Sequence, residues 1–461
     1  MQRVFAIIWL TWKAAFRFRL FLVVAALLLL TVVAFPLLIK DDGTARGFTQ
    51  IVLTYTLSTI AALLGLSTLW LACGTLARDI EECQMQVVAT KPIARWQIWI
   101  GKYLGILTLN AALLALSGAS VYALLQFRAT RLPPEQQHIL RSEVLVARGS
   151  AREASLEQEI QSETDRLLRE RLARSPVSQV DLAEVRKQIY EQVKAEYQLV
   201  QPGYIRVWEI NLGPARHRLR DKPLQIRFKY NSADRSPSGT FTVLFQVGVP
   251  DKTPLWRSEP MSVAPDTFHE FEIPPNLFDA DGLLTISALN PNNTSLLFPL
   301  DEGMEVLYPQ GGFAPNYLRG LGIIFCWMAV LAALGLAAAS LMSFPVAAFF
   351  SLSLLALVFF SGTMASAVAE GTIAEFDAER GTRGSSPADV VVIPTFKALL
   401  AVINLVKSFS PVDSLSTGRS ITWGQLGLAF AQIVVLLGGL LCAAGIAIFH
   451  RRELATAQAT P

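Results

Sequence analysis

The sequence predicts an α-helical polytopic membrane protein with six spans and an extracytoplasmic α+β domain. The 461 residues are 52% hydrophobic and only 17% charged, which is too apolar for a soluble protein of this length. Six apolar runs have about the 20 residues that a bilayer-spanning helix needs. A polar stretch, residues 127–317, separates the third run from the fourth and is long enough to form a core of its own.

The predicted spans cover residues 20–39, 50–76, 101–126, 318–341, 344–368 and 424–449. The first run is long for a signal peptide and no small-residue cleavage site follows it, so we expect it to be retained. Residues 1–19 carry basic residues and no acid, which predicts a cytoplasmic N-terminus. Alternation then places residues 77–100 and the C-terminus in the cytoplasm, and residues 127–317 and 369–423 outside.

Three parts follow from this topology. Residues 1–126 hold an N-terminal helix and the first three spans, with a patterned hairpin at 77–100. The N-terminal helix alternates aromatic and basic residues, which is typical of a helix lying in the membrane interface; a flanking anchor for the first span is the alternative. Residues 318–461 hold the last three spans and a cytoplasmic C-terminus.

The outer part, residues 127–317, divides in two. Residues 134–200 are rich in Glu, Gln, Arg and Leu at helical spacing, and we expect a helical hairpin there. Residues 203–310 contain short β-branched and aromatic runs between turn signals, which predict an antiparallel β-sandwich. Trp208 and Trp256 would stack on a sugar if exposed, whereas core or rim positions are the common alternative. An envelope protein or a polysaccharide is the expected kind of outer partner.

The loop at 369–423 is apolar but is interrupted by Pro394, Lys397 and Lys407. We expect short helices that lie at or dip into the outer leaflet. A seventh span is the alternative, and it would place the C-terminal basic residues on the outer side.

Several kinds of chemistry have no motif in the chain. The four cysteines lie in or beside apolar segments, the four histidines are scattered, and no P-loop or G-x-S-x-G pattern occurs. The net charge of +3 gives no basic field for nucleic acid. We therefore expect no catalytic residue, metal or cofactor in this chain, and no enzymatic activity of its own.

Two motifs resemble those of ABC type-2 exporter permeases. The stretch "ARDIEECQMQVVATKPIARWQIWIGKYLG" is similar to the family's cytoplasmic coupling segment, and its matching residues are Lys91, Pro92, Arg95, Gly101, Lys102 and Gly105. The end of the chain resembles the family's terminal motif at Phe449, Arg451, Arg452, Glu453 and Leu454. The resemblance covers the membrane part, and the insertion at 127–317 is additional to the core family.

The resemblance implies a permease of a bacterial inner membrane, paired with a second copy or a related chain. A separate cytoplasmic ATPase would bind the ATP and would dock on the hairpin at Asp79, Glu81, Glu82, Lys91, Pro92 and Arg95. Two other functions remain open at this stage. The membrane part could transmit ATPase strokes outward without transport, or the chain could be an anchored sensor or scaffold.

Overall fold

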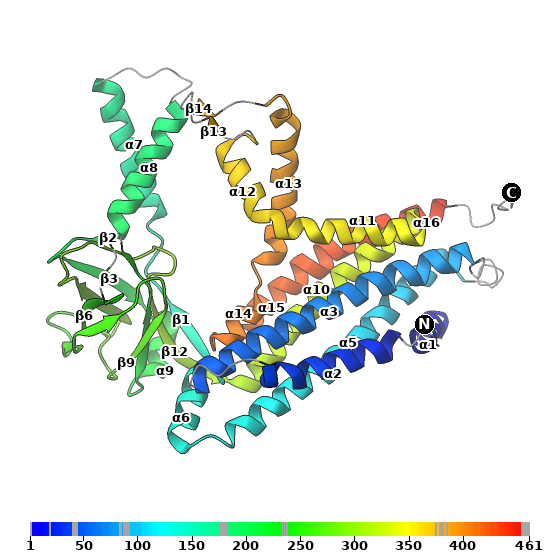
Figure 1. Ribbon diagram of the computed structural model, residues 1–461, viewed down its shortest axis with the longest axis horizontal. Coiled ribbons are helices and arrows are strands. Elements are labelled where there is room, and N and C mark those ends of the chain that lie inside the picture. Colours follow the sequence, from blue (N-terminus) through cyan, green and yellow to red (C-terminus); the bar gives the residue numbers. More distant parts are fainter. Residues whose placement is uncertain are drawn as a thin grey trace. The chain divides into compact units, whose positions relative to one another are not determined.

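The computed structural model divides into two compact units, a helical unit (residues 1–147 and 311–461) and a β unit (residues 148–310). It describes residues 2–17, 20–38, 45–82, 85, 93–174, 182–232, 234, 236, 238–373, 376–377, 382–383 and 386–452. Figure 1 shows long helices in the first unit and packed sheets in the second. The β unit lies within the predicted polar domain and is shorter at both ends, because the flanking helices continue into that stretch.

The helical unit is built from helices of very different length. They are α1 Gln2–Arg17, α2 Leu20–Leu38, α3 Ala45–Glu81, α5 Arg95–Ala129, α6 Pro134–Glu143, α10 Phe313–Leu341, α11 Phe344–Leu357, α12 Ser361–Glu370, α13 Asp389–Lys407, α14 Pro411–Ser416, α15 Trp423–Ala429 and α16 Gly439–Arg451. A π-helix, η3 Phe430–Gly438, joins α15 to α16, and a short 3₁₀ turn joins α11 to α12. Two short strands, β13 Phe376–Asp377 and β14 Thr382–Arg383, pair with each other between α12 and α13.

Six helical segments among the described residues are long and apolar enough to cross a membrane. Five of them coincide with the second to sixth predicted spans, which fits a polytopic helical protein. The first predicted span corresponds to α2, Leu20–Leu38, within which Leu22–Ala34 is an apolar helical segment.

The sixth apolar segment, Asp389–Ser416, lies in the predicted outer loop. Our prediction of only short helices there is wrong, because α13 runs for 19 residues with Pro394 inside it. Helices α12 and α13 lie side by side as a hairpin (Figure 1). The length and composition of Asp389–Ser416 suit the alternative of a seventh span, which stays a prediction.

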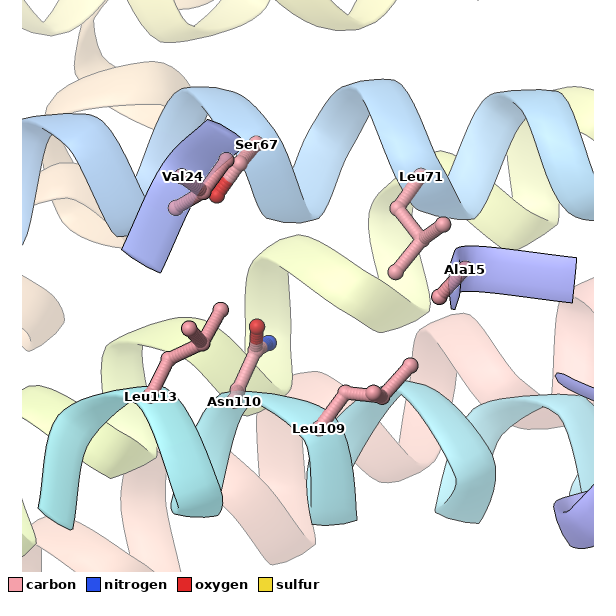
Figure 2. Close-up of a pocket in the computed structure, with 7 residues that line it drawn as sticks. All are labelled: Ala15, Val24, Ser67, Leu71, Leu109, Asn110 and Leu113. Carbon is pink, nitrogen blue, oxygen red and sulfur yellow. The ribbon is translucent and has the colours of Figure 1, made fainter. Parts of the chain in front are cut away.

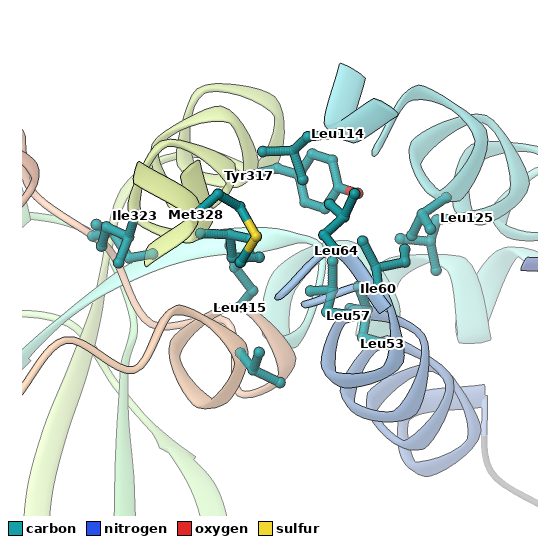
Figure 3. Packing of buried hydrophobic residues seen from close by; sticks show 14 of the residues in the cluster. Leu53, Leu57, Ile60, Leu64, Leu114, Leu125, Tyr317, Ile323, Met328 and Leu415 are labelled. Atoms are coloured by element: carbon teal, nitrogen blue, oxygen red, sulfur yellow. The ribbon is translucent and has the colours of Figure 1, made fainter. Parts of the chain in front are cut away.

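The core of the helical unit forms where α3, α5 and α10 pack together. Leu53, Leu57, Ile60 and Leu64 recur at helical spacing on α3 and are fully buried. Figure 3 shows these side chains facing residues of α5 and α10. Tyr317 on α10 adds a polar tie, since its hydroxyl donates to the backbone carbonyl of Gly118 at 3.1 Å.

Two glycines allow the N-terminal helix to dock on α5. A Cβ at Gly101 would lie 2.7 Å from the Cβ of Ile7, and one at Gly105 would lie 2.7 Å from the Cβ of Thr11. This four-residue spacing puts both glycines on one face of α5 and lets the backbones approach closely. The predicted N-terminal helix is therefore a separate helix, α1, which packs against α5 through its smaller residues and leaves Trp9 exposed.

The β unit contains two sheets that share one hydrophobic core. One has the order β1-β12-β4-β9, and the other has the order β3-β10-β6-β7 with β8 also paired to β6. Their strands are β1 Val146–Ala151, β3 Ile205–Asn211, β4 Leu224–Phe228, β6 Phe241–Val247, β7 Trp256–Arg257, β8 Met261–Val263, β9 His269–Ile273, β10 Leu283–Leu289 and β12 Met304–Gly312. A third small sheet joins β2 Leu199–Val200, β11 Leu296–Leu297 and β5 Asn231–Ser232.

Strands β3, β4, β6, β9 and β10 coincide with β-branched and aromatic runs of residues 203–310, so antiparallel sheets occupy the stretch where the sequence predicts them. Strand β6 alternates buried and half-buried residues, as a strand with one core face should. The paired registers of β3, β10 and β6 are antiparallel. The prediction for 134–200 is partly wrong, because strand β1 interrupts the helical stretch there. The hairpin consists of α7 Glu157–Arg174 and α8 Leu182–Gln198.

A row of buried charges crosses the sheet β1-β12-β4-β9. Arg227 on β4 lies opposite Glu305 of β12 and Glu270 of β9 in the register, so opposite charges alternate across the strands. Arg227 lies 3.4 Å from Glu305 and 3.7 Å from Glu270, and Arg148 donates to Glu270 at 3.0 Å. Cross-strand neighbours of opposite charge stabilise a sheet, and burial makes the loss of any single partner costly.

Replacing Gly105 by Leu should detach α1 from α5, because the added side chain would occupy the position of Thr11. We expect faster hydrogen exchange across residues 2–17, measured by mass spectrometry on the full-length protein. Gly362→Leu is the matched control, since a Cβ at Gly362 meets nothing within 4 Å. Unchanged protection of α1 in the Gly105 variant would contradict this packing.

Asp279 should make the stability of the β unit depend on pH. The backbone N–H of Leu283 holds the pKa of the Asp279 carboxyl below its usual range, and Lys252 adds to the effect. A lowered folded-state pKa contributes stability that is present above the unfolded value of about 4 and is lost as the pH falls. The Tm of Asp279→Asn should therefore lie below the wild-type Tm at pH 7, and the two should converge below about pH 4. A difference that is constant with pH would contradict this role.

Candidate functional site: the helix-end cluster

The residues predicted to dock an ATPase fall at the ends of two long helices. Asp79 and Glu81 lie in the last turn of α3, and Glu82 follows it in an exposed turn. Arg95 is the first residue of α5. Lys91 and Pro92 lie outside the described residues. The described part of the predicted hairpin at 77–100 is thus continuous with the helices on either side of it.

Side chains from five helices meet at this end of the helical unit. We call them the helix-end cluster: Arg78, Asp79, Glu81, Arg95, Trp99, Lys102, Ser340, Phe344 and Arg452. They come from the end of α3, the start of α5, the end of α10, the start of α11 and the residue that follows α16. The Lys/Arg bias predicts this end to be cytoplasmic.

Arg95 caps the end of α16. Its guanidinium donates to the carbonyl oxygens of His450 at 2.7 Å, Arg452 at 2.8 Å and Phe449 at 3.3 Å. The last carbonyls of a helix have no partner within the helix and carry its negative dipole end, so a guanidinium satisfies both their hydrogen bonding and their charge.

Arg452 repeats this arrangement on another helix. It donates to the carbonyl oxygens of Ala339 at 3.1 Å and Ser340 at 3.0 Å, at the end of α10. Arg95 therefore holds α16, and the residue just after α16 holds α10. The two arginines join three helices in series.

Glu81 caps a helix at its N-terminal end. Its carboxylate accepts a hydrogen bond of 2.8 Å from the backbone N–H of Phe344, the first residue of α11. The N-cap residue of α11, Ser343, makes no side-chain capping bond, so Glu81 supplies the cap from α3. The guanidinium of Arg78 lies 4.3 Å from the centroid of the Phe344 ring and adds a cation–π contact.

Lys102 joins α5 to α3. Its ammonium donates to Asp79 at 2.5 Å and to the carbonyl oxygen of Thr75 at 2.6 Å. The Lys102 side chain is only 9% exposed, whereas that of Asp79 is 32% exposed. A buried ammonium needs such partners, because an unpaired charge in this setting is strongly unfavourable.

Trp99 fills the space between α5, α10 and α16. The ring is fully buried, and its indole N–H donates to the hydroxyl of Ser340 at 3.1 Å. A Cβ at Gly445 of α16 would lie 2.8 Å from this ring, so the glycine makes room for it. The apolar ring thereby packs beneath the polar contacts of the cluster.

Three of the predicted docking residues bind neighbouring helices of the same chain. Asp79 pairs with Lys102, Glu81 caps α11, and Arg95 caps α16. Arg452 is predicted only as part of a terminal motif, and no sequence pattern selects Trp99, Ser340 or Phe344. The separation in sequence is 112 positions between Arg452 and Ser340, 241 between Trp99 and Ser340, and 263 between Phe344 and Glu81, so local patterns carry no signal for these contacts.

The two tryptophans considered for sugar binding occupy different positions in the β unit. Trp208 is only 2% exposed and packs against Phe298 in the core, so its ring is not presented at the surface. Trp256 is half-buried and stacks on Phe271 at a centroid distance of 5.9 Å. Ligand contact through Trp256 stays a prediction.

The comparisons with known proteins add no assignment. The chain was compared with protein-family models, curated proteins and solved structures, and none of them matches it. Within the described ranges, no group of three or more His, Cys, Asp or Glu side chains could hold a metal ion. The helix-end cluster and the sequence motifs are therefore the features from which function is inferred.

Removing the partner of Lys102 should be more damaging than removing Lys102 itself. Asp79→Asn leaves a nearly buried ammonium without its counter-charge, whereas Lys102→Met leaves a carboxylate that reaches solvent. We expect Asp79→Asn to lower the Tm of the purified protein by several degrees, which corresponds to about 1–3 kcal/mol. The double variant should recover part of this loss. Additive effects in this double-mutant cycle would contradict the pairing.

Proposed function

We propose that the chain is the membrane-spanning permease subunit of an ATP-binding cassette exporter, driven by a separate cytoplasmic ATPase. The observation that carries the proposal is the helix-end cluster, at the end of the bundle that holds both coupling-segment and C-terminal motifs. The sequence has no P-loop, so the energy for transport would come from a partner.

A motor subunit needs a surface that moves as one body when it is pushed. Direct hydrogen bonds at 2.7–2.8 Å join α5 to α16 and α3 to α11, and Lys102 joins α3 to α5. A displacement applied to the segment between α3 and α5 would therefore reach the other three helices through these contacts. Chains of hydrogen bonds and packed side chains of this kind can carry coupling over a distance.

The contacts of the cluster divide the predicted docking residues into two groups with different roles. Asp79, Glu81 and Arg95 hold helices together inside this chain, so their charges are largely used. We therefore assign transmission of the movement to these three residues. The predicted docking residues that remain are Glu82, which is exposed in the turn after α3, and Lys91 and Pro92, which lie between α3 and α5 in the sequence, and we propose that the ATPase contacts them.

We further propose the membrane, the orientation and the partner chain of the protein. The protein would lie in a bacterial inner membrane with both termini cytoplasmic, and it would pair with a second copy or a related chain. The β unit, on the outer side, would receive cargo or bind an envelope component. In the alternative function, the membrane part transmits the ATPase strokes outward without transport. That function would use the same docking surface.

Purification of the full-length protein in mild detergent from its native host tests the proposal. We expect a P-loop ATPase to co-purify in near-stoichiometric amount, identified by mass spectrometry. The reversal Glu82→Lys with Lys91→Glu should abolish this co-purification and leave the size-exclusion profile unchanged. Arg95 is kept in both proteins because it caps α16.

Lys13→Glu is the matched control for this experiment. Lys13 is an exposed basic residue of α1, on the side predicted to be cytoplasmic and outside both motifs, and the ATPase should remain bound to that variant. Recovery of the wild-type chain without an ATPase would contradict the proposal. Retention of the ATPase by the double reversal would contradict the assigned docking residues.

A further inference from the structure

Three arginines lie at the end of the helical unit opposite the helix-end cluster. Arg128 is in the last turn of α5, Arg131 lies two residues beyond this helix, and Arg319 is in the second turn of α10. The other ends of α5 and α10 belong to the helix-end cluster. The predicted topology places the three arginines outside, where the positive-inside bias of membrane proteins disfavours cations, so their presence there needs a physical reason.

Each of the three guanidinium groups lies over an aromatic ring. The distances from the guanidinium carbon to the ring centroid are 4.3 Å for Arg128 on Phe48, 4.2 Å for Arg131 on Phe127 and 5.5 Å for Arg319 on Trp423. Such a cation–π contact covers one face of the planar guanidinium and leaves the edge that carries the N–H groups uncovered. We call these contacts the arginine–aromatic pairs.

The three cations have no anionic partner in the part of the chain that the structure describes. Arg319 donates through Nε to the carbonyl oxygen of Pro315 at 3.0 Å, within its own helix. None of the three arginines forms an ion pair with a described Asp or Glu. A guanidinium binds phosphate oxygens through two parallel N–H bonds, more strongly than it binds a neutral acceptor. The arginine–aromatic pairs therefore offer three uncompensated positive charges to a phosphate group.

Apolar surface continues from the arginine–aromatic pairs along the helices. Tyr55 lies seven residues after Phe48 on α3 and is 56% exposed, and Phe430 lies seven residues after Trp423 and is 52% exposed. This spacing keeps each ring on the same side of the helix as the first one. An acidic peptide or a free phosphate ion would pair with the arginines but not with these rings. A phospholipid has a headgroup for the arginines and acyl chains for the rings.

The pocket inside the bundle is too small for a lipid. Figure 2 shows this pocket where α1, α2, α3 and α5 meet, lined by Ser67, Asn110 and five aliphatic residues. It has room for about 20 Å³, which suits a single water molecule and cannot hold an acyl chain. A lipid would therefore bind on the outer surface of the helices, where the arginine–aromatic pairs lie.

We infer that the arginine–aromatic pairs bind the headgroups of anionic phospholipids, with a phosphate on the guanidinium groups and acyl chains along the exposed rings of α3 and η3. A net negative headgroup fits better than a zwitterionic one, because the latter brings its own cation to a site that already holds positive charge. An arginine near an anionic lipid surface strengthens binding about fivefold. The inference goes beyond the proposed function and does not depend on the ATPase.

Native mass spectrometry of the full-length protein in a neutral detergent tests the inference. Titration with phosphatidylglycerol, and separately with phosphatidylcholine of the same acyl chains, gives the affinity for each lipid. We expect tighter binding of phosphatidylglycerol by the wild-type protein. The preference should be lost, and phosphatidylglycerol binding weakened at least about fivefold, in the triple variant Arg128→Gln, Arg131→Gln and Arg319→Gln.

The matched control removes the same number of charges from another part of the chain. It is a triple variant of exposed basic residues in the β unit, Arg171→Gln, Lys187→Gln and Arg218→Gln. This variant has the same net charge as the first one, and it should keep the wild-type preference for phosphatidylglycerol.

A further variant keeps every charge and changes only the shape of the cation: Arg128→Lys, Arg131→Lys and Arg319→Lys. Lysine lacks the planar fork of N–H groups, so phosphatidylglycerol binding should fall between that of the wild-type protein and that of the glutamine variant. This variant decides the matter if the glutamine variant does not fold, since binding equal to wild type would then overturn the inference.

Three other results would overturn the inference. The first is equal binding of phosphatidylglycerol and phosphatidylcholine by the wild-type protein. The second is an equal loss of phosphatidylglycerol binding in the glutamine variant and in the matched control. The third is displacement of phosphatidylglycerol by glycerol 1-phosphate, which would assign the arginines to a soluble phosphate.

Discussion

The end of a helix is the constraint on which the helical unit depends. Four backbone carbonyls at one end and four N–H groups at the other lack partners within the helix, and a membrane interface makes unmet groups expensive. This chain meets part of the need with side chains from other helices. Arg95 serves α16, Arg452 serves α10, and Glu81 serves α11. The contacts that satisfy the backbone groups at the helix ends are thus the same contacts that hold the helices together.

Glycine residues allow the helices of the bundle to pack closely. Gly101 and Gly105 bring α1 against α5, and Gly445 admits the ring of Trp99. Lys102 lies between the two glycines in sequence but points to α3, where Asp79 receives it. One turn of α5 therefore serves two neighbours, α1 through its glycines and α3 through its lysine. The motif formed by Gly101, Lys102 and Gly105, which is part of the family resemblance, has a direct packing explanation.

Sequence patterns predicted the elements better than their tertiary roles. Strands β3, β4, β6, β9 and β10 follow from alternation and turn residues, and the long apolar helices follow from hydropathy. Strand β1 was missed because "VARGSA" has little β character and gains its place by pairing with β12. Both Trp208 and Arg95 were selected from the sequence, but their roles depend on distant partners. Trp208 is buried against Phe298, which is 90 positions away, and Arg95 caps a helix end that is more than 350 positions away. Such contacts depend on the folded topology, which no local window contains.

The reach of Arg95 also has a consequence for biosynthesis. The arginine leaves the ribosome long before its acceptors, since His450 is 355 residues further along the chain. During most of translation, Arg95 at the start of α5 must therefore remain without these carbonyl acceptors. The arginine contacts that close α10 and α16 can form only when α16 has been made. A nascent chain released early would lack this closure, which gives a quality-control system a structural difference between complete and incomplete copies.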